Sequence, residues 1–189
     1  MIGTAKSMLS RFRREERGSV VVEAVVILPL LVWTYTAMFV FFDAYKTENL
    51  TVKAAYTVAD MISRQTEPVD ADYINGMNTI FGFLTDGNPQ NEVRVSVVGM
   101  VTGADNQPEL ELVWSYTTDP TKLPQLCSVA PIEQRIPILS LGDQLIVVEA
   151  IMGWQPAFNA GLGERTLYEL VVAKPRFSGR VDWDDAPTC

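Results

Sequence analysis

One carboxylate, Glu23, lies inside a long apolar run, and the chemistry open to it is charge pairing. The run covers residues 20–42, and Glu23 is its only Asp, Glu, Lys or Arg. A charged side chain at the centre of a membrane-spanning helix costs about 2.5–3.5 kcal/mol on insertion scales. Because of this cost, an ionisable residue in such a segment is by default a candidate functional residue.

The junction of Gly18 and Ser19 precedes the apolar run and is a candidate cleavage site. Glycine leaves the backbone unhindered, as a protease needs at a scissile bond, although it also breaks a helix at a membrane edge. A secretory signal peptide instead has an apolar stretch of about 7–15 residues and then a small-residue cleavage site. Here the run is longer, and residues 41–45, Phe-Phe-Asp-Ala-Tyr, are a poor site. Cleavage after Gly18 would keep the apolar helix on the mature protein.

Length and charge divide the chain into three parts. Residues 20–42 can span about 30 Å of hydrocarbon as a helix, and residues 43–189 suffice for one domain with its own core. Residues 1–18 hold five basic and two acidic side chains, so the remainder carries a net charge of −11, against −8 for the whole chain. The positive-inside rule therefore predicts a cytoplasmic leader at 1–18, a transmembrane helix at 19–42 and an extracytoplasmic domain at 43–189. An acidic exterior would repel phosphates, which argues against a nucleic-acid partner.

The cysteines and the absence of histidine limit the chemistry further. Cys127 and Cys189 both fall in the external part, where an oxidising compartment predicts a disulfide between them; two unrelated buried thiols are the alternative. The disulfide would close a loop of about 60 residues and contribute about 4 kcal/mol. Without histidine, Ser-His-Asp, Cys-His and His-zinc sites are excluded, so we expect no enzyme, no metal and no other cofactor. A set of aspartates could ligate calcium but is better interpreted as a solvated tail: Asp182, Asp184 and Asp185.

Hydrophobic periodicity predicts an α+β domain, in which a long N-terminal helix packs on a small antiparallel sheet of about four strands. The helix continues from its membrane-spanning half through an amphipathic half at 43–65, with one apolar stripe formed by Val52, Ala55, Ala59 and Ile62. Asp70 is expected to cap a second helix that ends near Leu84.

Alternation of apolar and polar residues predicts four strands, at 92–101, 109–117, 144–152 and 166–174. The first two are separated by a short link, which predicts that they form an antiparallel hairpin. The third is more continuously apolar, which is typical of an interior strand. The proline-rich stretch 118–143 is long for a loop, so we expect it to be functional or held in place through Cys127.

The segment at 11–24, read with the apolar run through Pro29, resembles the start of the TadE-like minor pilins (pseudopilins) of the tight-adherence, or Flp, pilus system. It reads Arg-Phe-Arg-Arg-Glu-Glu-Arg-Gly-Ser-Val-Val-Val-Glu-Ala. In that family a short basic leader ends in glycine, a glutamate follows, and a proline often comes later; Gly18, Glu23 and Pro29 match this pattern. Many pilins begin the mature chain with Phe or Met, and the major Flp pilins have Tyr after the glutamate. This chain has Ser19 at the first of these positions and Ala24 at the second, which favours a minor component of the pilus over its major subunit.

The resemblance implies that a membrane prepilin peptidase cleaves after Gly18 at the bacterial inner membrane. The mature helix would then enter, or help to initiate, a type IVb-like pilus used for adhesion or secretion. The implied partners are other pilins, the inner-membrane assembly platform, the peptidase and the lipid bilayer. The alternative is an uncleaved, signal-anchored periplasmic scaffold or binding protein, in which Gly18 and Glu23 are incidental.

Glu23 and Pro29 have predicted roles in assembly. Cleavage would create an ammonium at Ser19, and the Glu23 carboxylate of one subunit could pair with the ammonium of its neighbour. Pairing inside one chain, across one helical turn, and a hydrated Glu23 near the headgroups are the alternatives. Pro29 removes one backbone donor from the helix and favours a kink or local opening, unless it merely reflects the frequency of proline in membrane helices.

Overall fold

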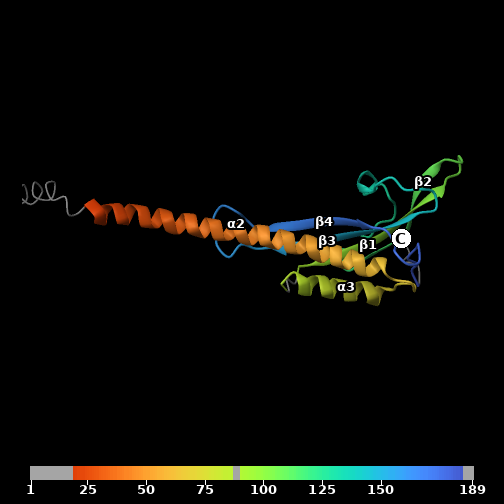
Figure 1. The fold of residues 1–189 in the computed structure, drawn as a ribbon, viewed down its shortest axis with the longest axis horizontal. Helices are drawn as coiled ribbons and strands as arrows, with labels where there is room; N and C mark the ends of the chain where they lie inside the picture. Colours follow the sequence, from red (N-terminus) through yellow and green to blue (C-terminus); the bar gives the residue numbers. More distant parts are fainter. Residues whose placement is uncertain (1–18, 87–89, 185–189) are drawn as a thin grey trace, which may run out of the picture. The chain divides into compact units, whose positions relative to one another are not determined.

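Four antiparallel strands form a sheet on which two helices pack (Figure 1). The structure, a computed structural model, describes residues 19–86 and 90–184. The strands are β1 (Glu92–Thr102), β2 (Pro108–Thr117), β3 (Gln144–Trp154) and β4 (Arg165–Ala173). The helices are α2 (Ser19–Ser63) and α3 (Ala71–Leu84), and the short 3-10 helix η2 (Glu133–Arg135) lies between β2 and β3 in the sequence. The predicted α+β class is confirmed.

By internal contacts the described residues form two compact units. One unit contains residues 19–43 of α2 together with the β3–β4 loop, Pro156–Gly163. The other contains the second half of α2, α3 and the sheet.

The strand order is β2-β1-β3-β4, so β1 and β3 are interior strands. Val95 of β1 lies opposite Tyr116 of β2 on one side and Val148 of β3 on the other. The predicted β1–β2 hairpin is confirmed and contains a register shift between Val97 and Val98. The continuous apolar run of β3 is explained by its position, because both of its faces are buried.

The second half of α2 and the apolar face of α3 cover one face of the sheet. Their buried side chains form one core with those of the strands: Ala54, Ala55, Val58, Ala59, Ile62, Ile74, Met77 and Phe81 against Val93, Val95, Val97, Ile146, Val148 and Ala150. Three members of the predicted α2 stripe are fully buried, whereas Val52 is only partly buried. The predicted cap of α3 is confirmed, because the Asp70 carboxylate accepts a hydrogen bond from the Tyr73 amide at 2.8 Å.

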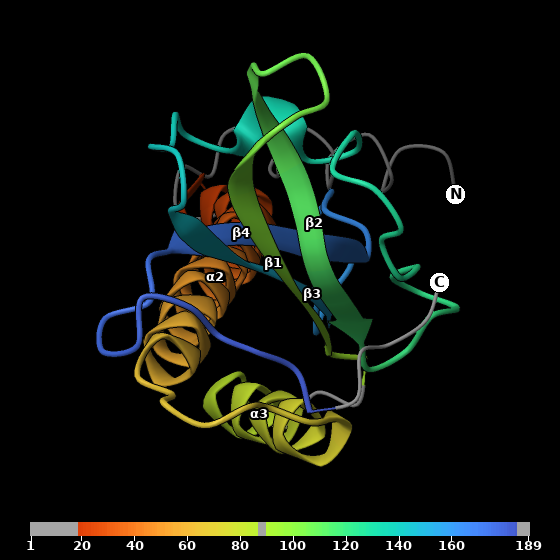
Figure 2. The ribbon, with the colours of Figure 1, turned by 90° about the vertical axis from the view of Figure 1, so that its right-hand side faces the viewer.

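The proline-rich stretch between β2 and β3 covers the opposite face of the sheet. Its apolar side chains Leu126, Val129 and Ile132 pack on a second cluster that includes Leu145 and Val147. Figure 2 shows η2 and its loop on the side of the sheet away from α3. The long loop is therefore a structural layer of the domain, because without it the second face of the sheet would be exposed to water.

The C-terminal segment is bound to the core. The Val69 amide donates to the Asp182 carbonyl at 2.9 Å, and the Asp184 amide donates to the Val69 carbonyl at 3.0 Å. The ring of Trp183 lies 4.9 Å from that of Trp114, centroid to centroid. The aspartates interpreted as a solvated tail do keep exposed side chains: the side chain of Asp182 is 47% exposed and pairs with Arg180, and Asp184 is exposed. The backbone between them is nevertheless held on the core, where Trp183 is partly buried; Asp185 lies outside the described residues.

Phe81 and Phe83 provide a matched test of this packing, because they lie two residues apart on α3. Phe81 is 0% exposed and Phe83 is 83% exposed. We expect Phe81→Ala to lower the free energy of unfolding by about 3–5 kcal/mol, since it leaves a cavity between α3 and the sheet. Phe83→Ala should change it by no more than about 0.5 kcal/mol. Urea unfolding of the detergent-solubilised chain measures both values, and equal losses would contradict the packing.

Candidate functional site

The first half of α2 presents apolar side chains on every side. From Val20 to Tyr35, every large apolar side chain is exposed, including Val20 at 72% and Leu28 at 61%. A helix that is hydrophobic all round belongs in a core or in a membrane. Only 6% of its most apolar window is buried, so the described residues leave this part of the helix largely uncovered. Among the described helices, α2 alone is long and apolar enough to cross a membrane.

Glu23 lies on this exposed surface. It lines a shallow, open groove along one face of the helix, together with Val20, Ala24, Ile27, Leu28 and Leu31. Within residues 19–86 and 90–184, no hydrogen bond or ion pair reaches the Glu23 carboxylate. The described residues thus leave the Glu23 carboxylate open to the solvent, the lipid headgroups or another chain.

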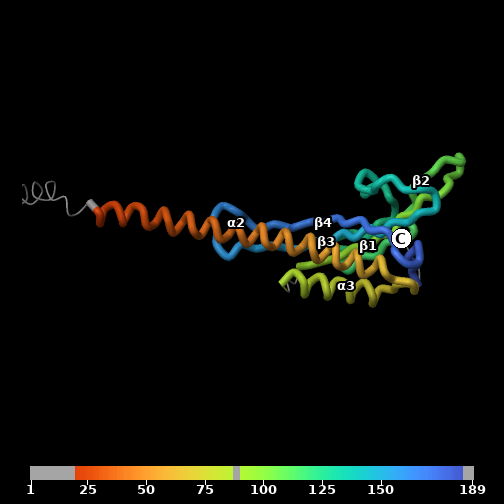
Figure 3. Tube along the Cα trace, in the orientation of Figure 1, coloured from red at the N-terminus to blue at the C-terminus, as the bar shows by residue number. Residues whose placement is uncertain are grey.

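α2 is helical through Pro29, and its trace in Figure 3 continues from Ser19 to Ser63. Pro29 has no N–H, so the carbonyl of Val25, four residues earlier, lacks its helical donor. Two other polar side chains in the apolar half are satisfied within the helix: the Thr34 hydroxyl donates to the Leu30 carbonyl, and the Thr36 hydroxyl to the Val32 carbonyl, both at 2.8 Å. This local pairing suits a segment in which water is absent.

The remaining predicted site residues are placed only in part. Ser19 is the first residue of α2, while Gly18 lies outside the described residues. Cys127 lies in the long loop between β2 and β3, and Cys189 also lies outside the described residues. Cleavage after Gly18 and the Cys127–Cys189 disulfide therefore stay predictions.

The structure brings together a buried polar cluster that sequence patterns did not predict. Arg94 of β1 makes two hydrogen bonds to Glu149 of β3, each 2.7 Å, and their side chains are 8% and 2% exposed. Tyr168 of β4 donates to the same carboxylate at 2.5 Å. Burial, and then the neighbouring Glu149 carboxylate, raise the pKa of Tyr168 to about 12. Glu149 is the one charged residue in the apolar run of β3. It could have pointed to this cluster, because a charge buried in a sheet needs a partner.

This cluster holds the long loop on the sheet. Arg94 also donates to the carbonyl of Pro124, and the guanidinium of Arg135 lies 5.1 Å from the centre of the Tyr168 ring. The Arg94 and Glu149 charges are matched and buried, so the cluster has the character of a structural tie.

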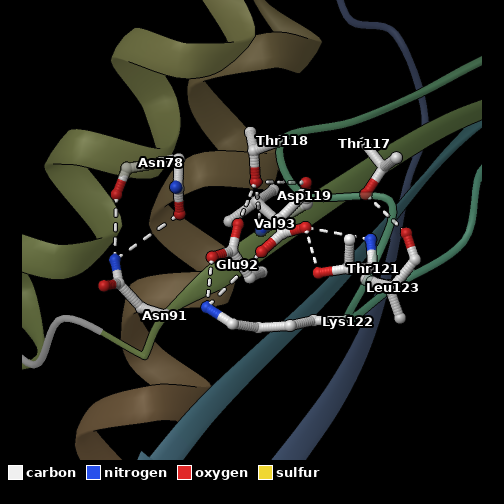
Figure 4. Close-up of polar contacts among 10 residues, drawn as sticks. All are labelled: Asn78, Asn91, Glu92, Val93, Thr117, Thr118, Asp119, Thr121, Lys122 and Leu123. Carbon is white, nitrogen blue, oxygen red and sulfur yellow. Dashed lines mark hydrogen bonds and ion pairs between the residues drawn. The ribbon is translucent and has the colours of Figure 1, made fainter.

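A second polar group fixes the start of the same loop (Figure 4). Lys122 donates to one carboxylate oxygen of Glu92 at 2.8 Å, and the Thr118 hydroxyl donates to the other at 2.7 Å. The hydrogen bond to Glu92 raises the pKa of Lys122. Asp119 accepts hydrogen bonds from the amide and hydroxyl of Thr121, and these lower its pKa.

One cleft lies between α2 and the end of β4, with a volume of about 590 Å³. The charged side chains that line this cleft form ion pairs: Asp60 pairs with Arg64 and Arg176, and Lys174 pairs with Asp143. Among the described residues, no three His, Cys, Asp or Glu side chains are grouped as a metal site would require. The exposed half of α2 is therefore the strongest candidate functional surface.

Comparison of the chain with protein-family models, with curated proteins and with solved structures gives no match. The geometry of the described residues is therefore the basis for assigning a function. A long N-terminal apolar helix whose second half packs on an antiparallel sheet is a pilin-like architecture in shape.

The Arg94–Glu149 pair yields a stability prediction. Glu149→Ala should lower the free energy of unfolding by about 3–5 kcal/mol, because it leaves the Arg94 charge buried without its partner. Replacing both residues by apolar ones, Arg94→Met with Glu149→Leu, should recover most of that loss. Glu111→Ala, on an exposed position of β2, is the control and should cost no more than about 0.5 kcal/mol. A cost for Glu149→Ala that equals the control, measured by urea unfolding, would show that the pair does not hold the loop.

Proposed function

We propose that this chain is a minor pilin (pseudopilin) of the TadE-like kind, which helps to assemble or initiate a tight-adherence (Flp) pilus. The observation that carries the proposal is the division of α2. Its second half is buried on the chain's own sheet, while its first half exposes apolar side chains on all sides. Such a helix is suited first to a bilayer and then to packing against the helices of other subunits.

The proposed processing site lies before the helix. A cut after Gly18 would leave Ser19, the first residue of α2, as the new N-terminus. A cut after the apolar run, as in a signal peptide, would sever α2 in the middle, because the helix continues past Asp43 to Ser63. A protease binds an extended backbone at the scissile bond, so the helix itself opposes cleavage at 41–45. We therefore propose a prepilin peptidase as the processing enzyme.

Glu23 has its proposed role at the contact between subunits. The carboxylate has no partner among the described residues, and the apolar surface around it would be covered by neighbouring helices in a filament. Two buried unlike charges offset each other's desolvation when they pair with good geometry. Pairing of Glu23 with the Ser19 ammonium of the next subunit would also fix the axial register of the helices.

The remaining parts of the proposal follow from charge and hydrophobicity. The basic leader at 1–18 would stay in the cytoplasm and the acidic domain would face the periplasm. The partners are other pilins, the assembly platform of the inner membrane and the peptidase. The function is structural, and the proposal includes no enzymatic step, metal or cofactor.

Replacement of Glu23 tests the pairing. In cells that carry the whole pilus system, we expect Glu23→Gln to reduce co-purification with the other pilins about tenfold or more, because a hydrogen bond to a charged group contributes about 1.5–3 kcal/mol. Glu67→Gln removes an exposed carboxylate outside the apolar run and is the matched control.

Two results would contradict different parts of the proposal. Unchanged co-purification of the Glu23→Gln chain, with normal processing, would contradict the pairing. Failure of the unaltered chain to co-purify with any pilin, while it remains in the membrane, would contradict the pilin function. The chain would then be an anchored periplasmic protein.

A further inference from the structure

The β3–β4 loop, Pro156–Gly163, lies against the membrane half of α2. The two segments belong to one compact unit, and Figure 1 shows the loop beside the helix. The ring of Phe158 meets the ring of Phe39 edge-on, with 6.4 Å between their centroids. Nearby on the helix, Val40 is only 1% exposed, although the apolar residues around it are exposed. The loop thus contacts α2 at a defined level along the helix axis, that of Phe39.

That level lies inside the apolar run. Phe39 precedes the end of the run, Phe42, by three residues, or about 4.5 Å of helix. Each interfacial layer of a bilayer, between the hydrocarbon and bulk water, is about 5–8 Å thick. A loop in contact with Phe39 therefore reaches the depth at which the helix enters the lipid headgroups.

The composition of the loop suits that depth. Residues 154–163 contain no charged side chain, and Glu164 and Arg165 follow at once. Phe158 is 56% exposed even though one edge of its ring meets Phe39. On the helix, Asp43 is the first charge after Glu23. Both segments thus change from uncharged to charged just beyond their point of contact.

The backbone of the loop limits how deeply it can enter. Irregular backbone exposed to hydrocarbon would leave its N–H and C=O groups unsatisfied. The described loop turns back on itself, with the Ala160 amide donating to the Phe158 carbonyl at 3.0 Å and Gly161 at a φ of +96°. The headgroup layer, which offers water and polar groups, is the environment that fits both this backbone and the exposed Phe158 ring.

We propose that the β3–β4 loop is a second membrane-contact site, which binds the headgroup layer of the bilayer through Phe158 while α2 spans the hydrocarbon. This inference rests on the proposed membrane span of α2. It assigns to the loop a lipid surface as its partner, in continuity with the surface of the helix that it touches. Contact with lipid at two points restricts the depth and rotation of a helix that would otherwise be fixed only by its ends.

Three matched substitutions test the proposal in the full-length chain, reconstituted in vesicles of phosphatidylcholine and phosphatidylglycerol. Ala157→Cys places an environment-sensitive fluorophore in the loop without removing Phe158. Ala104→Cys places it in the β1–β2 turn, and Ala24→Cys in the apolar half of α2; all three alanines are exposed. Labelling is done without reductant, and the unmodified chain gives the background from the native cysteines. Spin-labelled lipids in the same vesicles report contact with the bilayer.

We expect a blue-shifted emission and strong quenching at position 157 by lipids that carry the spin label near the headgroup. Position 24 should be quenched by lipids labelled deeper in the acyl chain, and position 104 should not be quenched. Quenching at 24 but not at 157, or equal quenching at 157 and 104, would overturn the loop proposal while leaving the membrane span intact. Absence of quenching at 24 would overturn the span, and the loop proposal with it. Should Ala157→Cys fail to fold, Asn159→Cys tests the same exposed loop.

Discussion

The structure depends on one constraint: the apolar surface of α2 must be kept from water along its whole length. A buried aliphatic or aromatic side chain contributes about 1.5–3 kcal/mol, whereas a whole domain is stable by about 5–15 kcal/mol. The sheet and α3 cover the second half of the helix, from Ala54 to Ile62. Among the described residues the first half is largely uncovered, because only 6% of its most apolar window is buried. A single helix thus connects a folded domain to an environment that something else must supply. The proposed bilayer, followed by the helices of other subunits, would meet this requirement.

The same constraint acts on charge. Glu149 and Glu23 are each the only carboxylate in an apolar segment, one in β3 and one in α2. Glu149 has its partner within the chain, where Arg94 and Tyr168 enclose it. Glu23 has no partner among the described residues. The contrast supports the proposal that its partner comes from another subunit. One carboxylate then stabilises the fold, and the other would stabilise the assembly.

Local patterns in the sequence were sufficient for the elements, because each depends on neighbours along the chain. The strand predicted at 92–101 is observed as Glu92–Thr102, and the cap at Asp70 has the expected hydrogen bond. Strand order, the loop that covers the second face of the sheet, and the Arg94–Glu149 pair join residues far apart in sequence, so periodicity alone could not reveal them. At the candidate site, Glu23 and Pro29 stand out as exceptions within an apolar run. The contact of Phe158 with Phe39 has no such signal, since nothing in the local sequence says which segment a loop will touch.

The most direct test of the central claim, that α2 is retained whole on the mature protein, is the intact mass of the membrane-extracted chain made with and without an active prepilin peptidase. The account predicts an N-terminus at Ser19 when the peptidase is active and at Met1 when it is not. An N-terminus beyond Phe42 would contradict it, because the exposed half of the helix would then be a discarded signal. An N-terminus at Met1 in both cases would contradict the processing, and would leave an anchored domain in place of an assembled pilin.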